Sequence, residues 1–210
     1  MKKVVIVTGA SSGMGKSAAR FLHQQGYVVY GAARRVAEMD DLKAEGLQVV
    51  QMDITEDATI VSAVDHVLQQ EGRIDVLINN AGYGSYGAVE DVTIEEAKRQ
   101  FEVNLFGMAR ITQLVLPSMR AQQSGRIVNI SSMGGKIYTP FGAWYHATKH
   151  AVEGWSDCLR LELKPFGIDV VIVEPGGIKT PWGTIASDNL KINSGKGAYA
   201  EHANKVANAT

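Results

Sequence analysis

The sequence has little of what several classes of protein require. Its only cysteine is Cys158, so no disulfide can form within the chain, and a cytoplasmic location is expected. No apolar run approaches the roughly 18 residues of a membrane helix, and residues 4–7 are too short a run for a signal peptide. With 21 basic and 22 acidic residues, the chain lacks the positive charge typical of nucleic-acid and membrane-surface partners. The five histidines show no metal-ligand spacing, so no metal site is predicted.

Short β-branched runs alternate with segments of helical periodicity along most of the chain. The length of 210 residues suits one sizeable domain. The alternation predicts an α/β fold with a three-layer, doubly wound parallel sheet, Rossmann-like and ordered 3-2-1-4-5-6. Ligands bind at the carboxyl ends of such strands, so the residues after each run are the candidates for a site. The runs cover residues 3–7, 27–32, 47–52, 74–78, 126–130 and 168–173.

The first run ends in a glycine-rich turn, TGASSGMG at residues 8–15, and a helical pattern follows at once. Strand, glycine turn and helix are the context that a nucleotide-binding loop requires. Gly9 permits the tight turn, Gly13 lets backbone approach a pyrophosphate, and Gly15 lets the helix pack against the strand. The helix N-terminus would supply N–H groups to the phosphates. The alternative is a turn that merely ends a strand.

The residues after the second run indicate which dinucleotide is bound. An acidic residue there would accept hydrogen bonds from the adenosine ribose hydroxyls, but this chain has Arg34 nearby instead. A guanidinium offers a bidentate fork to a 2′-phosphate, and Ser11 can add a hydroxyl. The sequence therefore predicts NADP rather than NAD, with Arg34 on a solvated loop as the alternative.

Polar residues also follow the third and fourth runs. Asp53 can accept from an adenine amino group, or it can cap the helix predicted over 56–71. Residues 79–82, NNAG, offer amide groups and close backbone approach to a ligand, or simply a structural turn. Asn104 lies in an apolar stretch of a helix predicted over 94–122 and needs a partner. Either the backbone satisfies Asn104 or it takes part in a proton relay.

Tyr145 and Lys149 stand four residues apart in a helix predicted over 142–165, so their side chains share a face. A free tyrosine has a pKa of about 10 and is a poor acid–base catalyst at neutral pH. A lysine cation beside it would lower that pKa and make a usable proton donor. Ser132, after the fifth run, can place its hydroxyl beside a carbonyl oxygen. The alternative is a solvated helix face.

Taken in order, these motifs make residues 3–182 resemble the single-domain short-chain dehydrogenases/reductases. The resemblance implies hydride transfer between NADP(H) and a carbonyl or secondary alcohol. It implies that Tyr145 is the general acid–base, that Ser132 polarises the substrate and that Asn104 supports a water relay. Lys149 would hold the nicotinamide ribose and lower the Tyr145 pKa. The motifs are TGASSGMG (8–15), NNAG (79–82), VNLFG (103–107), NISS (129–132), YHATK (145–149) and PGGIKT (175–180).

The strand ends and the resemblance together give two sets of expected contacts. The residues expected at the cofactor are Gly9, Ser11, Ser12, Gly13, Met14, Gly15, Arg34, Asp53, Ile54, Asn80, Ala81, Gly82, Tyr145, Lys149, Pro175, Gly176, Ile178 and Thr180. Those expected at the substrate are Ser132, Met133, Tyr138, Tyr145 and Trp182. The apolar and aromatic residues suit a lipophilic ketone, a steroid-like ring or an aldehyde, although such residues can equally belong to a core.

Residues 1–182 are expected to form one NADP-binding catalytic domain, and 183–210 a partly helical or poorly ordered remnant of a substrate lid. Relatives usually continue with another helix and a seventh strand, so that edge strand is expected to be absent. Relatives also commonly form homodimers or homotetramers through helices equivalent to 94–122 and 142–165, which is expected here. The alternatives are a catalytically impaired or non-catalytic NADP-binding module, and an interaction protein that exchanges partners.

Overall fold

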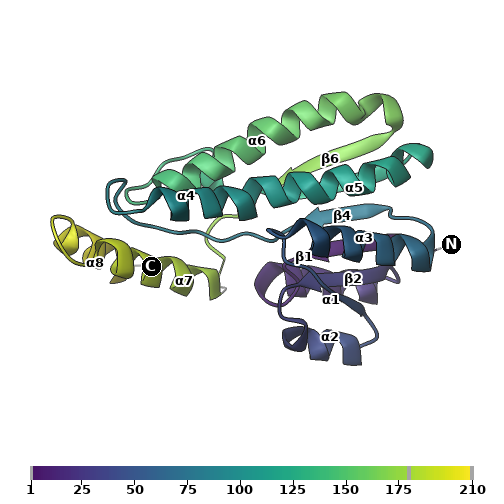
Figure 1. The fold of residues 1–210 in the computed structure, drawn as a ribbon, viewed down its shortest axis with the longest axis horizontal. Helices are drawn as coiled ribbons and strands as arrows, with labels where there is room; N and C mark the ends of the chain where they lie inside the picture. The colour runs from purple at the N-terminus through teal and green to yellow at the C-terminus, as the bar shows by residue number, and fades with distance from the viewer. Residues whose placement is uncertain (1, 179–180, 209–210) are drawn as a thin grey trace.

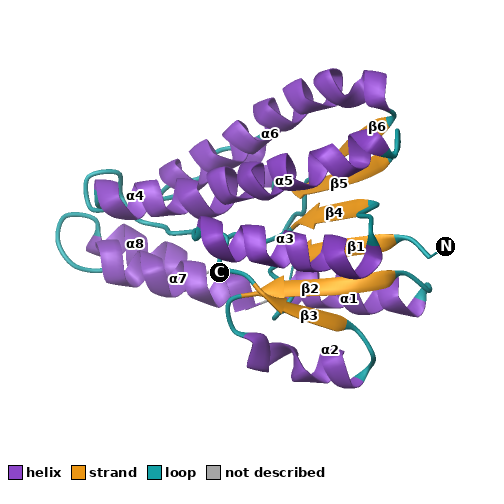
Figure 2. Ribbon diagram, turned by 45° about the vertical axis from the view of Figure 1, so that its right-hand side comes forward, coloured by secondary structure: helices purple, strands orange, loops and turns teal. Residues whose placement is uncertain are grey.

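The computed structural model describes residues 2–178 and 181–208 (Figure 1). Six strands form one parallel sheet in the order β3-β2-β1-β4-β5-β6, which confirms the predicted topology. All the carboxyl ends of the strands therefore lie at one edge of the sheet (Figure 2). The strands are β1 (Val4–Thr8), β2 (Val28–Ala33), β3 (Gln48–Gln51), β4 (Val76–Asn79), β5 (Gly125–Ile130) and β6 (Ile168–Val173).

Helices connect consecutive strands and cover the sheet on both faces. None of the described helices is long and apolar enough to span a membrane. The α-helices are α1 (Gly13–Gln24), α2 (Asp40–Ala44), α3 (Asp57–Glu71), α4 (Ile94–Phe101), α5 (Gly107–Ala121), α6 (Ala143–Leu163), α7 (Pro181–Ser194) and α8 (Ala200–Asn208). Short helical turns are η1 (Val36–Met39), η2 (Glu102–Phe106), η3 (Met133–Gly135) and η4 (Lys164–Phe166).

The first strand shows why its run is apolar throughout. Val4 and Ile6 point into a core shared with α3, α5 and α6, whereas Val5 and Val7 point into a second core shared with α1 and α2. A parallel strand that is buried on both faces carries apolar residues at every position, not only at alternate ones. The two cores fix the turn after β1 between helices on both sides.

The side of the sheet that faces α1 is less well covered over β4, β5 and β6. The parallel register places Ile78, Val128 and Val171 in one row with the buried Val7. Exposure rises along this row, and Val171 and Val173 on β6 are 38% and 40% exposed. We call this surface of β4–β6 the open face. It contrasts with the other side of the same strands, where α5 and α6 bury Ile127 and Val170.

The predicted helix over 94–122 is interrupted by one wider turn. Thr93 caps its start by accepting a hydrogen bond from the Glu96 N–H at 3.2 Å. Residues Glu102–Phe106 then form a π-helical turn between α4 and α5. Single π-helical turns inside α-helices are frequent at functional sites. This one contains Asn104.

The C-terminal segment is more regular than the sequence predicted, because α7 and α8 form a helical hairpin. The predicted boundary at residue 182 falls in the first turn of α7. Leu190 of α7 and Ala203 of α8 are buried against each other, and Tyr86 and Phe141 pack onto them. The Asn193 amide also donates to the Tyr86 carbonyl at 2.8 Å. The hairpin lies beyond the carboxyl ends of the strands, away from α1 and α2 (Figure 1).

Candidate active site

The turn after β1 adopts a conformation that only glycine accepts easily at two positions. Gly9 and Gly13 have φ of 66° and 54°, in the left-handed region. The end of β4 also packs closely against this turn. A Cβ on Gly9 would lie 2.9 Å from the Cα of Ala81, and a Cβ on Gly15 would lie 2.4 Å from the Gly9 carbonyl oxygen. The turn and the start of α1 are therefore held at van der Waals distance from β4.

Asn80 braces the same turn through hydrogen bonds. Its amide nitrogen donates to the carbonyl oxygens of Thr8 at 2.9 Å and Gly9 at 3.3 Å. The backbone N–H groups of Asn80 and Ala81 both donate to the Thr8 hydroxyl at 3.0 Å. A structural turn, the alternative considered for NNAG, accounts for the side chain of Asn80. Contact of Asn80, Ala81 or Gly82 with a cofactor remains a prediction.

The N-terminus of α1 is suited to a phosphate group. Ser12 is the extended residue before the helix, its side chain makes no capping hydrogen bond, and the first turn contains no acidic residue. By contrast, α4 begins with the capping Thr93 and carries Glu95 and Glu96 in its first turn. The first N–H groups of a helix need partners and favour anions. Exposed Ser12 and Met14 lie at this helix start, so the turn fits the pyrophosphate of a dinucleotide.

Arg34 and Asp53 follow β2 and β3 at the same edge of the sheet. Arg34 is exposed. Burial tends to raise the pKa of Asp53, but hydrogen bonds from Thr55 and the charges of Arg34 and Arg99 outweigh it, so that pKa is lowered. Asp53 accepts from the Thr55 N–H at 2.9 Å, ahead of the first residue of α3. The N-cap residue of α3 is Glu56, so Asp53 does not cap this helix. Ile54, next to Asp53, is buried.

Tyr145 and Lys149 both come from α6 and are buried, at 6% and 7% exposure. The Lys149 ammonium donates to the Ile130 carbonyl at the end of β5, 2.8 Å away, and lies 5.9 Å from the centre of the Tyr145 ring. Burial lowers the pKa of Lys149 to about 8, although the charge of Glu153 acts in the opposite direction. The structure thus brings together two residues that the sequence paired on one helix face.

The expected lowering of the Tyr145 pKa by Lys149 was wrong for this structure. Burial raises the pKa of Tyr145, and a hydrogen bond with Ser132 lowers it only in part. The reason is geometric: Lys149 points its ammonium at the Ile130 carbonyl rather than at the phenol. Ser132 itself lies at the start of η3, where its hydroxyl accepts from the Gly134 N–H at 3.0 Å. Ser132 and Tyr145 are therefore adjacent, as predicted for a pair that contacts one substrate oxygen.

Asn104 is held in the π-helical turn by three hydrogen bonds. Its amide nitrogen donates to the Tyr83 carbonyl at 2.9 Å and to the Thr148 hydroxyl at 3.0 Å, and its oxygen accepts from the Tyr83 N–H at 3.0 Å. The backbone thus satisfies most of the Asn104 side chain. A Cβ on Gly82 would lie 3.2 Å from the Asn104 oxygen and 3.9 Å from the Lys149 ammonium. Both polar groups therefore lie close to Gly82.

An aromatic cluster covers Tyr145 on the side of α7. The ring centre of Tyr145 lies 5.1 Å from that of Trp182 and 5.7 Å from that of Tyr86. Burial is the main cause that raises the pKa of Tyr86 to about 12. Trp182, predicted at the substrate site, therefore lies beside Tyr145 together with Tyr86. Of the two tyrosines in residues 83–87, Tyr83 instead donates to Glu96 at 2.9 Å.

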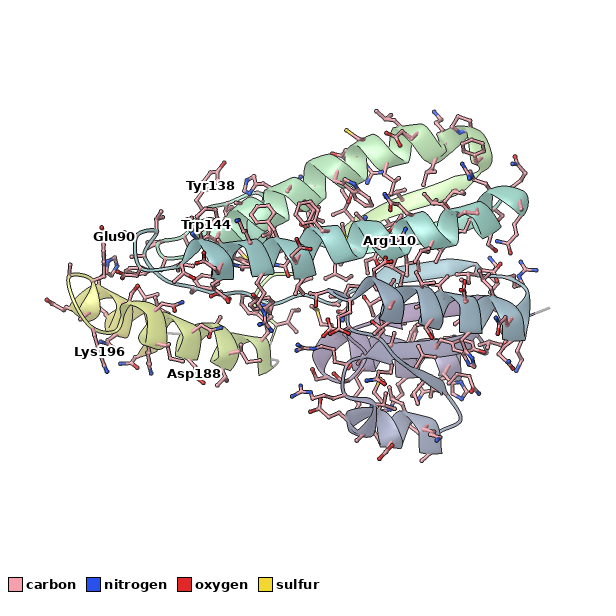
Figure 3. The ribbon with its side chains drawn as sticks, in the orientation of Figure 1. Glu90, Arg110, Tyr138, Trp144, Asp188 and Lys196 are labelled. Atoms are coloured by element: carbon pink, nitrogen blue, oxygen red, sulfur yellow. The ribbon has the colours of Figure 1, made fainter. Side chains whose placement is uncertain are left out.

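Met133 and Tyr138, the two other residues predicted at the substrate, are much more exposed than Tyr145. Met133 is about half exposed, and its sulfur lies 3.8 Å from the position of a Cβ on Gly176. Tyr138 is 79% exposed and stacks on His150, with ring centres 5.2 Å apart, on the outer side of α6 (Figure 3). Contact of Tyr138 with a substrate remains a prediction. The Tyr138 ring lies on the surface because His150 provides a flat partner there.

The turn after β6 reaches the same edge. The Pro175 carbonyl accepts from the Met133 N–H at 3.0 Å, which joins this turn to η3. Gly176 and Ile178 are exposed. Thr180, predicted at the nicotinamide, lies outside the described residues.

His146 is a residue of the site that the sequence did not single out. It is buried, and its Nδ1 lies 2.8 Å from the Gly134 carbonyl oxygen. Its Nε2 accepts from the Thr139 N–H at 3.0 Å, so Nδ1 carries the proton and donates to Gly134. Gly134 in turn donates to Ser132, and His146 therefore anchors the loop that carries this serine. The only signal of His146 in the sequence was its position next to Tyr145 in the motif YHATK.

Comparisons with known proteins find similarity along most of this chain. A sequence profile described as short chain dehydrogenase matches residues 3–190. The 3-ketodihydrosphingosine reductase of Bacteroides thetaiotaomicron is 40% identical over 201 residues, which cover 96% of this chain and 72% of that protein. The structure of actinorhodin polyketide ketoreductase with NADPH has a TM-score of 0.85 and 32% identity, covering 99% and 89% of the two chains. A short-chain dehydrogenase/reductase from Burkholderia phymatum with NAD has a TM-score of 0.82 and 27% identity, covering 91% and 70%.

Proposed function

The chain belongs to the short-chain dehydrogenase/reductase family, and on this premise we propose that it is an NADP(H)-dependent reductase of lipophilic ketones. Family membership makes it an oxidoreductase that uses NAD(P) to interconvert carbonyl and alcohol groups. One observation carries the proposal. Tyr145, Ser132 and Lys149 converge at the carboxyl ends of the strands, close to an uncapped helix N-terminus that suits a pyrophosphate.

In the proposed reaction, the hydroxyls of Ser132 and Tyr145 donate hydrogen bonds to the substrate carbonyl oxygen. The bound cofactor supplies a hydride to the carbonyl carbon. Tyr145 then gives its proton to the oxygen, which completes the alcohol. Lys149 supports the negative charge that develops on Tyr145, and Asn104 holds the neighbouring backbone in place.

The preference for NADP rests on Arg34. Its exposed guanidinium follows β2, where a dinucleotide places its adenosine ribose, and its charge already acts on Asp53. A 2′-phosphate would pair with this cation. Solved relatives contain NADPH in one case and NAD in another, so the choice depends on residues of this chain. Arg34→Asp should shift the preference towards NADH, and unchanged selectivity would contradict the assignment.

The proposed substrate is lipophilic because aromatic rings surround the proposed proton donor. Tyr86 and Trp182 pack on Tyr145, and Phe141 joins them to the α7–α8 hairpin. The related protein from Bacteroides is named as a reductase of a long-chain ketone, which fits the same chemistry. A ketone with an alkyl chain is therefore a better probe than a small polar one.

The test begins with fluorescence titrations of NADPH and NADH, followed by turnover assays. Tight binding of NADPH with weak binding of NADH is the expected result. NADPH oxidation is then followed with 3-ketodihydrosphingosine, cyclohexanone and a steroid ketone in parallel. Faster turnover of the long-chain ketone supports the proposal. Binding of NADPH without turnover of any probe would favour a non-catalytic NADP-binding module. Binding of neither nucleotide would overturn both the reductase proposal and this alternative.

We further propose a homodimer or homotetramer built through α4 and α6, in a cytoplasmic protein. The support is an apolar hollow of about 350 Å³ lined by α4, η2 and the start of α6. Light scattering after size-exclusion chromatography tests the assembly, and a monomeric mass at micromolar concentration would contradict it. Residues lining the hollow are Ile94, Ala97, Lys98, Phe101, Glu102, Phe106 and Trp144.

A further inference from the structure

A buried carboxylate on α6 has no place in the reaction described above. Glu153 is 6% exposed, although glutamate is rarely buried unless it is paired. Its Oε2 lies 3.0 Å from the Lys136 ammonium, while Oε1 has no hydrogen-bond partner within the described part of the chain. Burying a charge with incomplete pairing is costly, so this side chain needs an explanation.

The loop that carries Ser132 leaves room for this carboxylate. A Cβ on Gly135 would lie 3.0 Å from Oε1 of Glu153 and 3.0 Å from the hydroxyl oxygen of Ser131. That hydroxyl is also buried, and no described residue bonds to it. Two polar atoms without partners thus face the space that the missing side chain of Gly135 leaves. A side chain at position 135 would require Glu153 to shift, since a Cβ there lies 2.9 Å from its Cγ.

Glu153 follows Lys149 by four residues, so the two side chains lie one turn apart on the same helix face. The Lys149 ammonium is buried and makes its hydrogen bond to the uncharged Ile130 carbonyl. No described carboxylate lies within 4.0 Å of it, and Glu153 is the acid whose charge acts on it. A buried cation without direct charge pairing depends strongly on the nearest opposite charge.

We propose that Glu153 is a positioning residue for the reaction, the buried counter-ion that keeps Lys149 in its ammonium form beside Tyr145. This inference rests on the proposed function only for the role of Lys149 in turnover. Its structural content, a buried carboxylate one helical turn from Lys149 and next to Gly135, stands on the fold. Without the carboxylate, Lys149 would be a buried cation with no compensating charge, and it would lose its proton more readily.

The charged and titratable groups around this pair come from three elements. Tyr145 lies on α6 with both residues. Lys136, which follows η3, binds Glu153 and also lies 3.6 Å from Glu174 beyond the end of β6. Lys136 is half exposed, and its positive charge offsets part of the negative charge of Glu153 that acts on Lys149. Removal of Lys136 and removal of Glu153 should therefore shift the pKa of Lys149 in opposite directions.

The protonation of Lys149 can be measured directly, without cofactor or substrate. In protein labelled with 13C at the lysine Cε, the Lys149 resonance is assigned by its loss in Lys149→Arg. We expect a titration midpoint of about 8 in the unmodified chain. In Glu153→Gln the midpoint should fall by about one pH unit, because the nearby negative charge is gone. In Lys136→Met the midpoint should rise.

The matched control is Glu174→Gln, which removes an exposed carboxylate bound to the same Lys136. Its midpoint should stay near that of the unmodified chain. An unchanged midpoint in a folded Glu153→Gln variant would overturn the proposal. Far-UV circular dichroism checks the fold, and if Glu153→Gln does not fold, a midpoint that fails to rise in Lys136→Met overturns it instead.

Turnover gives a second measurement that separates this inference from the proposed function. With a ketone that the chain reduces, the pH above which kcat/KM falls should move down in Glu153→Gln and up in Lys136→Met. If the unmodified chain reduces no ketone but the midpoints still move, the proposed function fails and the role of Glu153 towards Lys149 stands. If turnover is normal and neither variant changes its pH profile, the role of Glu153 fails and the proposed function stands.

Discussion

The two sides of the site are built differently. The glycine turn after β1 is fixed by uncharged groups: Thr8 and Asn80 bond to each other's backbone, and Gly15 lies in van der Waals contact with the turn. The other side, around Tyr145, consists of buried ionisable groups. Within the described residues, Lys149 hydrogen-bonds only to a backbone carbonyl, and Glu153 keeps one oxygen without a hydrogen-bond partner.

This difference suggests separate tasks: the glycine turn would bind the nucleotide, and the side around Tyr145 would carry out proton transfer. Hydrogen bonds between uncharged groups do not depend on pH, so the turn keeps one shape over the range in which the protein folds. Buried ionisable groups change with pH and with their neighbours' charges. We therefore expect substitutions on the turn side to change nucleotide affinity and stability, and those on the tyrosine side to change kcat and its pH dependence.

The largest effect is expected for Tyr145→Phe. Loss of the phenol should lower kcat by about 10²–10⁴-fold, the usual contribution of a positioned acid–base group. Because the substitution removes only the phenol oxygen and leaves the glycine turn unchanged, the Kd for NADPH should stay within about 3-fold. Turnover is measured under saturating NADPH, and binding by nicotinamide fluorescence. Normal turnover would show that another group donates the proton.

The next largest effect is expected for Gly15→Ala. The added methyl would lie 2.3 Å from the Asn80 amide and 2.4 Å from the Gly9 carbonyl oxygen, so the turn must move. Overpacking of this kind costs about 1–3 kcal/mol, and NADPH binding should weaken with it. Urea unfolding measures the loss. Gly154→Ala is the matched control, since a Cβ there meets no atom within 4 Å and should leave stability unchanged or higher.

A matched pair of asparagines tests the comparison more closely. Asn80→Ala and Asn104→Ala each remove side-chain hydrogen bonds to backbone, and each should cost about 1–3 kcal/mol of unfolding free energy. Their functional effects should differ. Asn80→Ala should raise the Kd for NADPH with little change in kcat, whereas Asn104→Ala should lower kcat. Equal effects of both variants on Kd and kcat would show that the two sides are not separable.

The smallest effect is expected for His146→Gln. A glutamine amide can replace one of the two contacts that His146 makes with Gly134 and Thr139, but not both in the same geometry. The Ser132 loop should loosen, and kcat should fall by about 10-fold, equivalent to about 1.4 kcal/mol. The control is His150→Gln on the next helical turn. A Kd for NADPH that rises in His146→Gln would place this residue on the binding side instead.

Much of the fold was predictable because its causes are local. The β-branched runs and the glycines at positions 9, 13 and 15 specify strand, turn and helix in sequence order. Tyr145 and Lys149 follow from the helical period alone. The connections between distant segments were not predictable in the same way. Nothing adjacent to Asn80 in the sequence indicates that it bonds to Thr8, 72 residues away.

The errors in the candidate site have the same origin. Tyr83, Tyr86 and Tyr138 look alike in the sequence, yet only Tyr86 packs on Tyr145. Their directions depend on partners elsewhere: Glu96 for Tyr83 and His150 for Tyr138. The pKa of Tyr145 likewise depends on burial and on where the Lys149 ammonium points, which helix periodicity does not specify.

The open face has a practical consequence for the protein in solution. Among the described strands, β6 pairs only with β5, so its outer edge has no strand partner beside exposed Val171 and Val173, and Arg160 donates to the Val170 carbonyl of β6. Such an edge can pair with another chain and promote aggregation. The surface ion pair between Arg126 and Asp169 on the same face places charge where it opposes stacking. Concentrated samples should therefore aggregate sooner when salt screens these charges.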